Sequence, residues 1–227
     1  TAEYESPEAE DYEVDFDHEG LMIVDLQNAA SPKHPEYGTS VTLNGVVAIS
    51  DVFTAANNLK GVMISDIGGG PWAAILLTWK PTSASAQYGY DPPVFTKGQV
   101  INVVGNFNAF CGTSTTNPYK HCSIQVELTP YQKDKGSVTV TEDTAEVPAP
   151  RVVNPALIRT DGAESTIWQS SLVEVDNVFV ETAPNSYGIF TVDAGLEIDD
   201  QLFAYDKTQI TIGKNYEKIV GYLFTSY

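Results

Sequence analysis

Two cysteines are the residues whose spacing points most directly to a chemical bond. Cys111 and Cys122 lie at the ends of the segment FCGTSTTNPYKHCS, which has apolar β-type segments on both sides. Facing each other at the neck of a long hairpin, they would form a disulfide, which for a loop of about ten residues contributes roughly 2–3 kcal/mol. Two buried free thiols are the alternative, and a metal site has only His121 as a further nearby ligand. We predict the disulfide and, with it, an oxidising compartment.

Carboxylates are the second group that could do chemistry. The densest set in a segment with strand character is Asp193, Glu197, Asp199 and Asp200. Paired carboxylates can act as acid and base in sugar hydrolysis, and several oxygen ligands can hold calcium. On a strand, Glu197 and Asp199 share one face and Asp200 lies on the other. Since no D-x-[DN]-x-[DN]-G loop occurs, calcium is kept only as a candidate cofactor, and solvent-facing acids are the plainer interpretation.

The sequence contains no recognisable catalytic constellation. The three histidines, His18, His34 and His121, have no partner pattern, and the H-E-x-x-H, G-x-S-x-G and G-x-x-x-x-G-K-[ST] motifs are all missing. The glycine run 68–70 is followed by Pro71 and no suitably placed Lys, so it predicts a sharp turn. We therefore expect no enzyme activity and no cofactor other than the calcium candidate.

Aromatic residues around the loop 80–95 offer a platform for ligand stacking. Trp79, Tyr88 and Tyr90 could stack a sugar or a base on the face of a small β-barrel. The alternative places Trp79 in the core and lets the two tyrosines pack the loop.

The charge distribution is strongly one-sided. The formal net charge is −18, and the first 25 residues contain ten acids and no Lys or Arg. Nucleic-acid binding needs cations to neutralise phosphates, so we expect no direct binding of DNA or RNA. An acidic block of this kind is typical of a solvated leader. Within it, however, Tyr12, Val14 and Phe16 alternate with acids, which also fits an edge strand that docks on this chain or on a neighbouring subunit.

No apolar run approaches the roughly 20 residues that a membrane-spanning helix needs. The N-terminus also has no cationic and apolar signal-peptide pattern. A mature secreted protein, or a lipoprotein with an anchor upstream of residue 1, would look the same.

An internal repeat must position these residues. Segment 96–110 reads TKGQVINVVGNFNAF and segment 211–225 reads TIGKNYEKIVGYLFT, so that Gly105 in the first corresponds to Gly221 in the second. Upstream, VTLNGVVAIS and GVMISDIGGG have counterparts in SLVEVDNVFV and GIFTVDAGLEIDD. Self-similarity on this scale indicates two copies of one small β-domain. Gly45 predicts a bulge in the first strand.

The predicted fold class is all-β: two tandem OB-fold-like Greek-key β-barrels behind an acidic leader. The expected divisions are 1–34 for the acidic leader and the segment that follows it, 35–135 for the first module, and 136–227 for a linker plus the second module. The second copy has only four of the five expected strands, so we expect it to lack its closing strand or to borrow one.

The quoted segments, together with PEYGTSVTLNGVVAIS, GVMISDIGGGPWAAILL and KGQVINVVGNF, resemble the tandem OB-like modules of secreted proteins and lipoproteins from myxobacteria and related bacteria. The resemblance covers about residues 35–227 and implies a fold and an extracellular, cell-surface or periplasmic location. Related modules also accompany extracellular nucleases and phosphoesterases.

These observations predict a non-catalytic structural or protein-interaction protein. Its specific form is a self-assembling subunit, in which Tyr12–Phe16 supply a strand to the second module of the next subunit. The alternatives are a carbohydrate-binding accessory module and an accessory domain of an extracellular nuclease or phosphoesterase.

Overall fold

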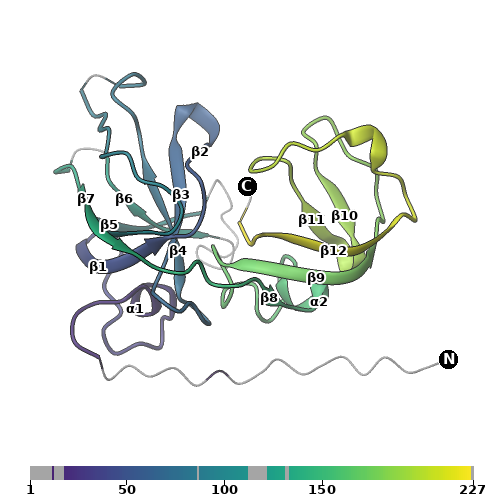
Figure 1. Ribbon diagram of the computed structural model, residues 1–227, viewed down its shortest axis with the longest axis horizontal. Coiled ribbons are helices and arrows are strands. Elements are labelled where there is room, and N and C mark those ends of the chain that lie inside the picture. Colours follow the sequence, from purple (N-terminus) through teal and green to yellow (C-terminus); the bar gives the residue numbers. More distant parts are fainter. Residues whose placement is uncertain (1–11, 13–17, 86, 112–121, 131–132, 226–227) are drawn as a thin grey trace.

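The chain folds mostly into β-strands with few short helices, as a computed structural model shows (Figure 1). The structure describes residues 12, 18–85, 87–111, 122–130 and 133–225. In Figure 1 strands β1–β7 gather on the left and β9–β12 on the right, and we call these groups the first and second unit. Among the described residues, no helix has the length and apolar composition that crossing a membrane requires.

Seven strands form the sheet of the first unit. They are β1 (Ser40–Ala48), β2 (Phe53–Thr54), β3 (Lys60–Ser65), β4 (Ala74–Trp79), β5 (Gln99–Phe110), β6 (Ser123–Glu127) and β7 (Ser137–Thr144). Their order is β1-β3-β4-β6-β5-β7, with β2 on β3, and β5 also pairs with β1, which brings the path back to its first strand. Strand β7 pairs with β5, so residues 137–144 extend the sheet of the first unit rather than link it to the second.

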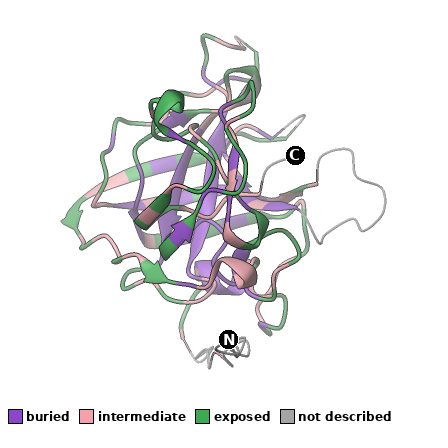
Figure 2. Cartoon of the chain, turned by 90° about the vertical axis from the view of Figure 1, so that its right-hand side faces the viewer, coloured by how far each residue is buried: buried purple, intermediate pink, exposed green. Residues whose placement is uncertain are grey.

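The core of the first unit is built from the inward faces of these strands (Figure 2). Leu43, Ile64, Leu77 and Phe107 are fully buried there, and burial of one such side chain is worth about 1.5–3 kcal/mol. Helix α1 (Ile23–Gln27) adds two of its own residues to this core. The segment before the first strand is therefore an integral part of the first unit.

The second unit is smaller and its strands lie in two sheets. It consists of β8 (Arg151–Val152), α2 (Pro155–Ile158), β9 (Leu172–Phe179), β10 (Phe190–Val192), β11 (Leu196–Ile198) and β12 (Asn215–Tyr222). One sheet has the order β12-β9-β8 and the other is the β10–β11 hairpin. A single bridge between Val180 and Val192 joins the end of β9 to β10. The remaining helical elements are single 3-10 turns: Ala56–Asn58, Asp193–Gly195 and Lys207–Gln209.

The bulge predicted at Gly45 is confirmed in the first unit. The register of β1 on β5 shifts between Leu43 and Val46, where Gly45 has φ 69°. In β9 the corresponding residue is Asn177, with φ 51°, but the register of β9 on β12 does not shift there. Both residue types tolerate the left-handed region. The two copies therefore share a left-handed residue at this position, while the bulge belongs to the first unit.

The two units contact each other through hydrogen bonds and through apolar packing, in which Tyr222 and Phe224 lie against a cluster of the first unit that includes Ile49. The main-chain N–H of Trp72 donates to the carbonyl of Ile167 at 2.7 Å. The side chain of Gln169 accepts from the main-chain N–H of Ile124 at 2.9 Å and donates to the carbonyl of Cys122, also at 2.9 Å. The start of β6 in the first unit is thereby tied to the segment that precedes β9.

Candidate strand-acceptor site

Strands β5 and β12 are held in their units by the same main-chain hydrogen bonds. Phe107 on β5 and Leu223 just after β12 each donate to, and accept from, the segment beside the first strand of their unit. The four bonds are Phe107 N to Thr39 O at 2.9 Å, Gly38 N to Phe107 O at 2.7 Å, Leu223 N to Ser171 O at 3.0 Å and Ser170 N to Leu223 O at 2.7 Å. Leu223 is therefore the structural equivalent of Phe107, and Gly221 is the equivalent of Gly105.

In the first unit, β6 fills the space between β4 and β5. It runs parallel to β4, where Val126 lies opposite Leu77, and antiparallel to β5, where Val126 lies opposite Phe107. The side chain of Val126 is fully buried in the core. Strand β6 thus joins the sheet edge of β4 to that of β5.

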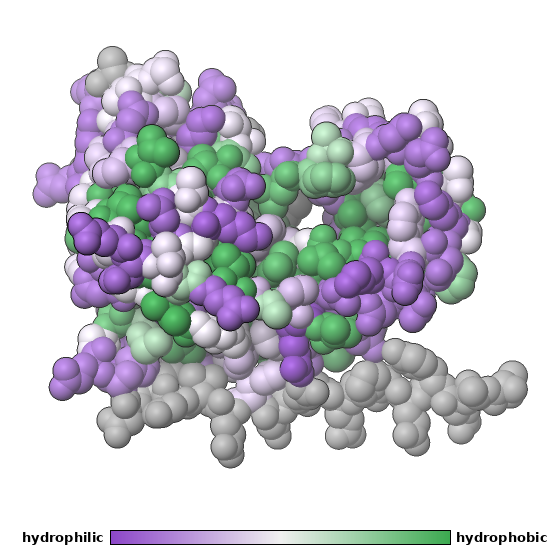
Figure 3. All heavy atoms as spheres, viewed as in Figure 1, coloured by the Kyte–Doolittle hydropathy of each residue, from purple (hydrophilic) through white to green (hydrophobic). Residues whose placement is uncertain are grey.

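In the second unit the equivalent space is open. Within the described part of the chain, β11 pairs only with β10, and β12 pairs only with β9. Residues of both strands line a cavity of about 610 Å³, which we call the open slot. Its lining includes Leu196, Ile198, Ile219, Gly221 and Leu223 of the second unit and Phe53, Met63 and Lys97 of the first. Figure 3 shows hydrophobic side chains gathered along the hollow between the two units. The open slot lies where the repeat would place a closing strand.

The two equivalent glycines have opposite surroundings. A Cβ on Gly105 would lie 2.4 Å from Cγ1 of Val126 and 3.1 Å from the carbonyl oxygen of Glu127, so β6 can pass only because this residue is glycine. Among the residues that the structure describes, a Cβ on Gly221 would meet nothing within 4 Å. Neither glycine has a positive φ. A glycine inside a strand costs about 0.5–1 kcal/mol relative to alanine and often marks the close approach of another backbone. The described chain supplies that backbone for Gly105 and not for Gly221.

The rim of the open slot carries charges of both signs. Lys97 and Arg159 line it together with Glu197 and Asp199. Burial, followed by the nearby Asp200 and Asp199, raises the pKa of Tyr205 to about 12, and its hydroxyl donates to the carbonyl of Gly188. Tyr205 is therefore a neutral phenol at physiological pH. The open slot is an apolar trough with a mixed rim, which suits an extended peptide better than an ion.

The four acids predicted as metal ligands do not assemble a site. Among the residues that the structure describes, no three His, Cys, Asp or Glu side chains come close enough to hold a metal ion. Asp200 instead forms an ion pair with Lys207 at 3.3 Å, and Glu197 and Asp199 are exposed or partly exposed on and after β11. Asp193 lies in the turn before that strand. The plainer interpretation, solvent-facing acids, fits these positions.

The aromatic platform predicted around loop 80–95 is largely buried. The prediction that Trp79 stacks a ligand is wrong, because its side chain is 5% exposed and packs in the core with Phe95 at a centroid distance of 6.4 Å. Tyr90 is partly buried, and its hydroxyl accepts from the main-chain N–H of Val138 at 3.3 Å. Of the three, Tyr88 is exposed, at 37%. One exposed ring does not make a platform.

The predicted disulfide is confirmed. Cys111 and Cys122 are bonded, with their Cα atoms 4.0 Å apart. The bond links the end of β5 to the start of β6, at the neck of the hairpin. It therefore fastens the closing strand of the first unit, and it fits an oxidising compartment.

Within the described part of the leader, Tyr12 contacts the junction of the two units. The ring of Tyr12 packs edge-on against Trp72 and Trp168, at centroid distances of 6.2 and 5.4 Å. Its hydroxyl donates to the buried carboxylate of Glu164 at 3.3 Å, to which Trp168 Nε1 also donates at 2.8 Å. Val14 and Phe16, the other predicted strand-addition residues, lie outside the described residues.

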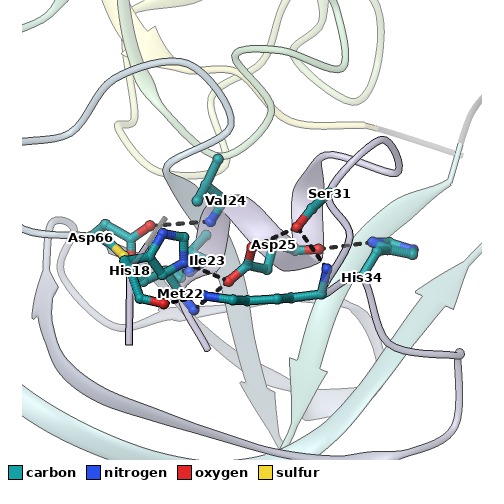
Figure 4. A network of polar contacts seen from close by, with 9 residues as sticks. His18, Met22, Ile23, Val24, Asp25, Ser31, His34 and Asp66 are labelled. Carbon is teal, nitrogen blue, oxygen red and sulfur yellow. Dashed lines mark hydrogen bonds and ion pairs between the residues drawn. The ribbon is translucent and has the colours of Figure 1, made fainter. Parts of the chain in front are cut away.

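A polar network around helix α1 was not predicted (Figure 4). Asp25 is fully buried and accepts from Ser31 Oγ at 2.6 Å and from the main-chain N–H of Met22 at 2.9 Å, and it contacts His18 Nε2 at 2.9 Å. Burial alone would raise the pKa of Asp25, but these partners outweigh it and hold the pKa below its usual value. The carboxylate lies between Ser31 and His18, so the network ties the segments before and after helix α1 together.

A second buried carboxylate ties the same helix to the first unit. Asp66 accepts from the main-chain N–H groups of Ile23 at 3.0 Å and Val24 at 3.1 Å. Burial raises the pKa of Asp66 to about 6, against the lowering effect of these two bonds. Asp66 lies 43 positions after Ile23 and 42 positions after Val24 in the sequence, so no local motif predicts the contact.

Comparisons with known proteins identify no family for this chain. No family model matches it, and no curated protein matches it. Among solved structures it is similar to a chain of a replication protein A heterotrimer bound to single-stranded DNA, with 10% sequence identity and a TM-score of 0.30. The match covers 69% of this chain and 35% of that chain, so the protein spans about a third of the length of that relative. At this level of similarity neither a family nor a ligand follows for this chain.

Proposed function

We propose that this protein is a non-catalytic, extracellular interaction protein whose second unit binds an extended polypeptide segment as an added β-strand. In this account both units are variants of the five-stranded OB-like Greek-key architecture. The first unit contains its closing strand, and the second takes one from another polypeptide. The observation that carries the proposal is Gly221, a strand glycine kept where the described chain requires none.

Physical reasons favour a strand over other ligands in the open slot. Residues of β11 and β12 line the slot, and in the described part of the chain each of these strands pairs on one side only. An unpaired edge presents main-chain donors and acceptors that another strand can satisfy. Each main-chain hydrogen bond contributes about 0.5–1.5 kcal/mol net. The first unit supplies a working example, because β6 satisfies both neighbouring edges at once.

The compartment and the absence of catalysis are parts of the same proposal. The disulfide supports an oxidising location outside the cytoplasm. In this proposal the polar network around Asp25 has a structural role. The carbohydrate-binding alternative loses its main support with the burial of Trp79.

A labelled peptide copying residues 123–129, SIQVELT, tests the acceptor directly. We expect it to bind the full-length chain in a fluorescence anisotropy titration at low protein concentration. Gly221→Val should weaken this binding at least tenfold, because its side chain fills the space over which the strand must pass. Glu217→Val, on the same strand but outside the slot lining, is the matched control and should bind as the wild type does. Equal binding by the wild type and Gly221→Val, or no binding at all, refutes the proposal.

A further inference from the structure

We propose that the strand received by the open slot is residues 12–16 of a second copy of this chain, with Val14 placed over Gly221. This inference rests on the strand-acceptor function proposed above and specifies its partner, direction and register. It follows from the first unit, whose own closing strand shows what the second unit must receive.

The leader and the closing strand of the first unit share one pattern. Residues 124–128 read IQVEL, and residues 12–16 read YEVDF. Position by position, both consist of a large apolar residue, a polar residue, valine, an acid and a large apolar residue. Alternate residues of a strand point to opposite faces, so each segment has an apolar face with valine at its centre.

The first unit shows how a segment with this pattern packs in the sheet. Val126 and Leu128 are fully buried, and Ile124 packs against the same core. On the other face, Glu127 accepts from the side chain of Gln125 at 2.6 Å. A leader strand bound in the same way buries Tyr12, Val14 and Phe16 and places its two acids on the opposite face, at the positions of the buried Gln125 and the partly buried Glu127.

The register of the leader strand follows from the equivalence of the two copies. Val126 lies opposite Phe107 on β5, and Phe107 corresponds to Leu223. Val14 therefore lies opposite Leu223, with its side chain over Gly221 as that of Val126 lies over Gly105. The leader strand runs antiparallel to β12 and parallel to β11, as β6 does with β5 and β4.

We take the donor to be a second copy because Tyr12, the described residue of this segment, contacts its own chain outside the slot lining. Tyr12 packs against Trp72 and Trp168 and bonds to Glu164, and none of these four residues lines the open slot. In this proposal the Tyr12 contact holds the leader on its own chain until the leader binds to a neighbouring copy. Because donor and acceptor are different surfaces, the contact is head-to-tail and can continue into a filament.

Charge does not drive this contact. The leader brings Glu13 and Asp15, and the slot rim combines Lys97 and Arg159 with Glu197 and Asp199. Each copy also carries a net charge of −18. Main-chain pairing and the fit of valine over glycine must therefore provide the specificity.

Mixing two full-length variants tests the inference. Val14→Asp has an intact slot but places a charge where the leader must be apolar, and Gly221→Val has an intact leader but a filled slot. Gly221→Val should fold, since a Cβ there meets nothing within 4 Å and φ is not left-handed; circular dichroism checks both variants.

In sedimentation velocity, we expect the wild type to form concentration-dependent oligomers and each variant alone to stay monomeric. An equimolar mixture of the variants should give a dimer and nothing larger, because one leader and one slot remain. A wild type that stays monomeric, or a mixture that does not dimerise, overturns the inference. If the SIQVELT peptide nevertheless binds the wild type and not Gly221→Val, the acceptor function stands and only its partner is wrong.

Discussion

Replacing the two equivalent glycines by alanine should change the stability of the chain in opposite directions. In Gly221→Ala the new methyl group meets nothing within 4 Å, and the backbone is not in the left-handed region. The substitution reduces the freedom of the unfolded chain, so we expect the free energy of unfolding to rise by about 0.4–1 kcal/mol.

In Gly105→Ala the same gain is outweighed by a clash. The new methyl group would lie 2.4 Å from Cγ1 of Val126 and 3.1 Å from the carbonyl oxygen of Glu127, so β6 must move. Forcing an extra carbon into a well-packed core costs about 1–3 kcal/mol. Because the intrinsic gain is common to both variants, this overpacking cost is the expected difference between them.

Urea unfolding followed by tryptophan fluorescence measures this difference, with the m value checked for each variant. Both substitutions are made in the Val14→Asp background, so that binding of a second copy does not add to the apparent stability. A Gly221→Ala variant destabilised by 1 kcal/mol or more would show that a segment of the same chain already crowds Gly221. The open slot would then be filled within the monomer, and the reasoning would fail.

Three further outcomes follow from the leader, the charge and the buried carboxylate. Tyr12→Phe keeps the apolar ring but loses the hydrogen bond to Glu164. Such a bond contributes about 1 kcal/mol, so we expect sedimentation to show assembly strengthened about fivefold. Weakened assembly would contradict the role of this contact in holding the leader on its own chain. Raising the salt concentration from about 0.05 to 0.5 M screens the repulsion between copies that each have a net charge of −18. We therefore expect light scattering to show stronger assembly at high salt. Weaker assembly would indicate that attractive ion pairs hold the copies together. Burial raises the pKa of Asp66 in the folded state from 3.8 to about 6. The resulting contribution of Asp66 to the free energy of unfolding is therefore fully present below pH 4 and is lost as the pH rises through 6. Asp66→Asn should remove this pH-dependent loss, which amounts to about 3 kcal/mol for two pKa units. If the free energies of unfolding of the two proteins run parallel between pH 4 and 7, the raised pKa of Asp66 is refuted.

Features carried by short-range patterns could be predicted from the sequence. The disulfide followed from two apolar segments around Cys111 and Cys122, and the bulge followed from Gly45 inside a strand pattern. The repeat itself pointed to the equivalence of Gly105 and Gly221. That Gly221 lies beside an empty space, however, depends on how four strands assemble, which composition and periodicity do not encode.

Other features depend on long-range contacts and could not be predicted. Trp79 stands next to a polar loop in the sequence, yet its position on β4 turns its ring into the core. Asp25 and Asp66 look like surface acids among many, and only the packing of α1 on the first unit buries them. The anchoring of Tyr12 likewise requires Trp72, Trp168 and Glu164 to meet at the junction of the two units.

The central claim, that a leader strand enters the open slot of another copy in one register, is tested most directly by a disulfide cross-link. Opposed residues of antiparallel strands have Cα atoms about 4.5–5.5 Å apart, which is within the range that a disulfide spans. A Val14→Cys chain mixed with a Leu223→Cys chain, with Cys111–Cys122 left intact, should give a covalent dimer under oxidising conditions, with the 14–223 link identified by mass spectrometry. An Asp15→Cys chain, whose side chain would point to the opposite face, should give little. Equal cross-linking of residues 14 and 15, or none from residue 14, would contradict the account.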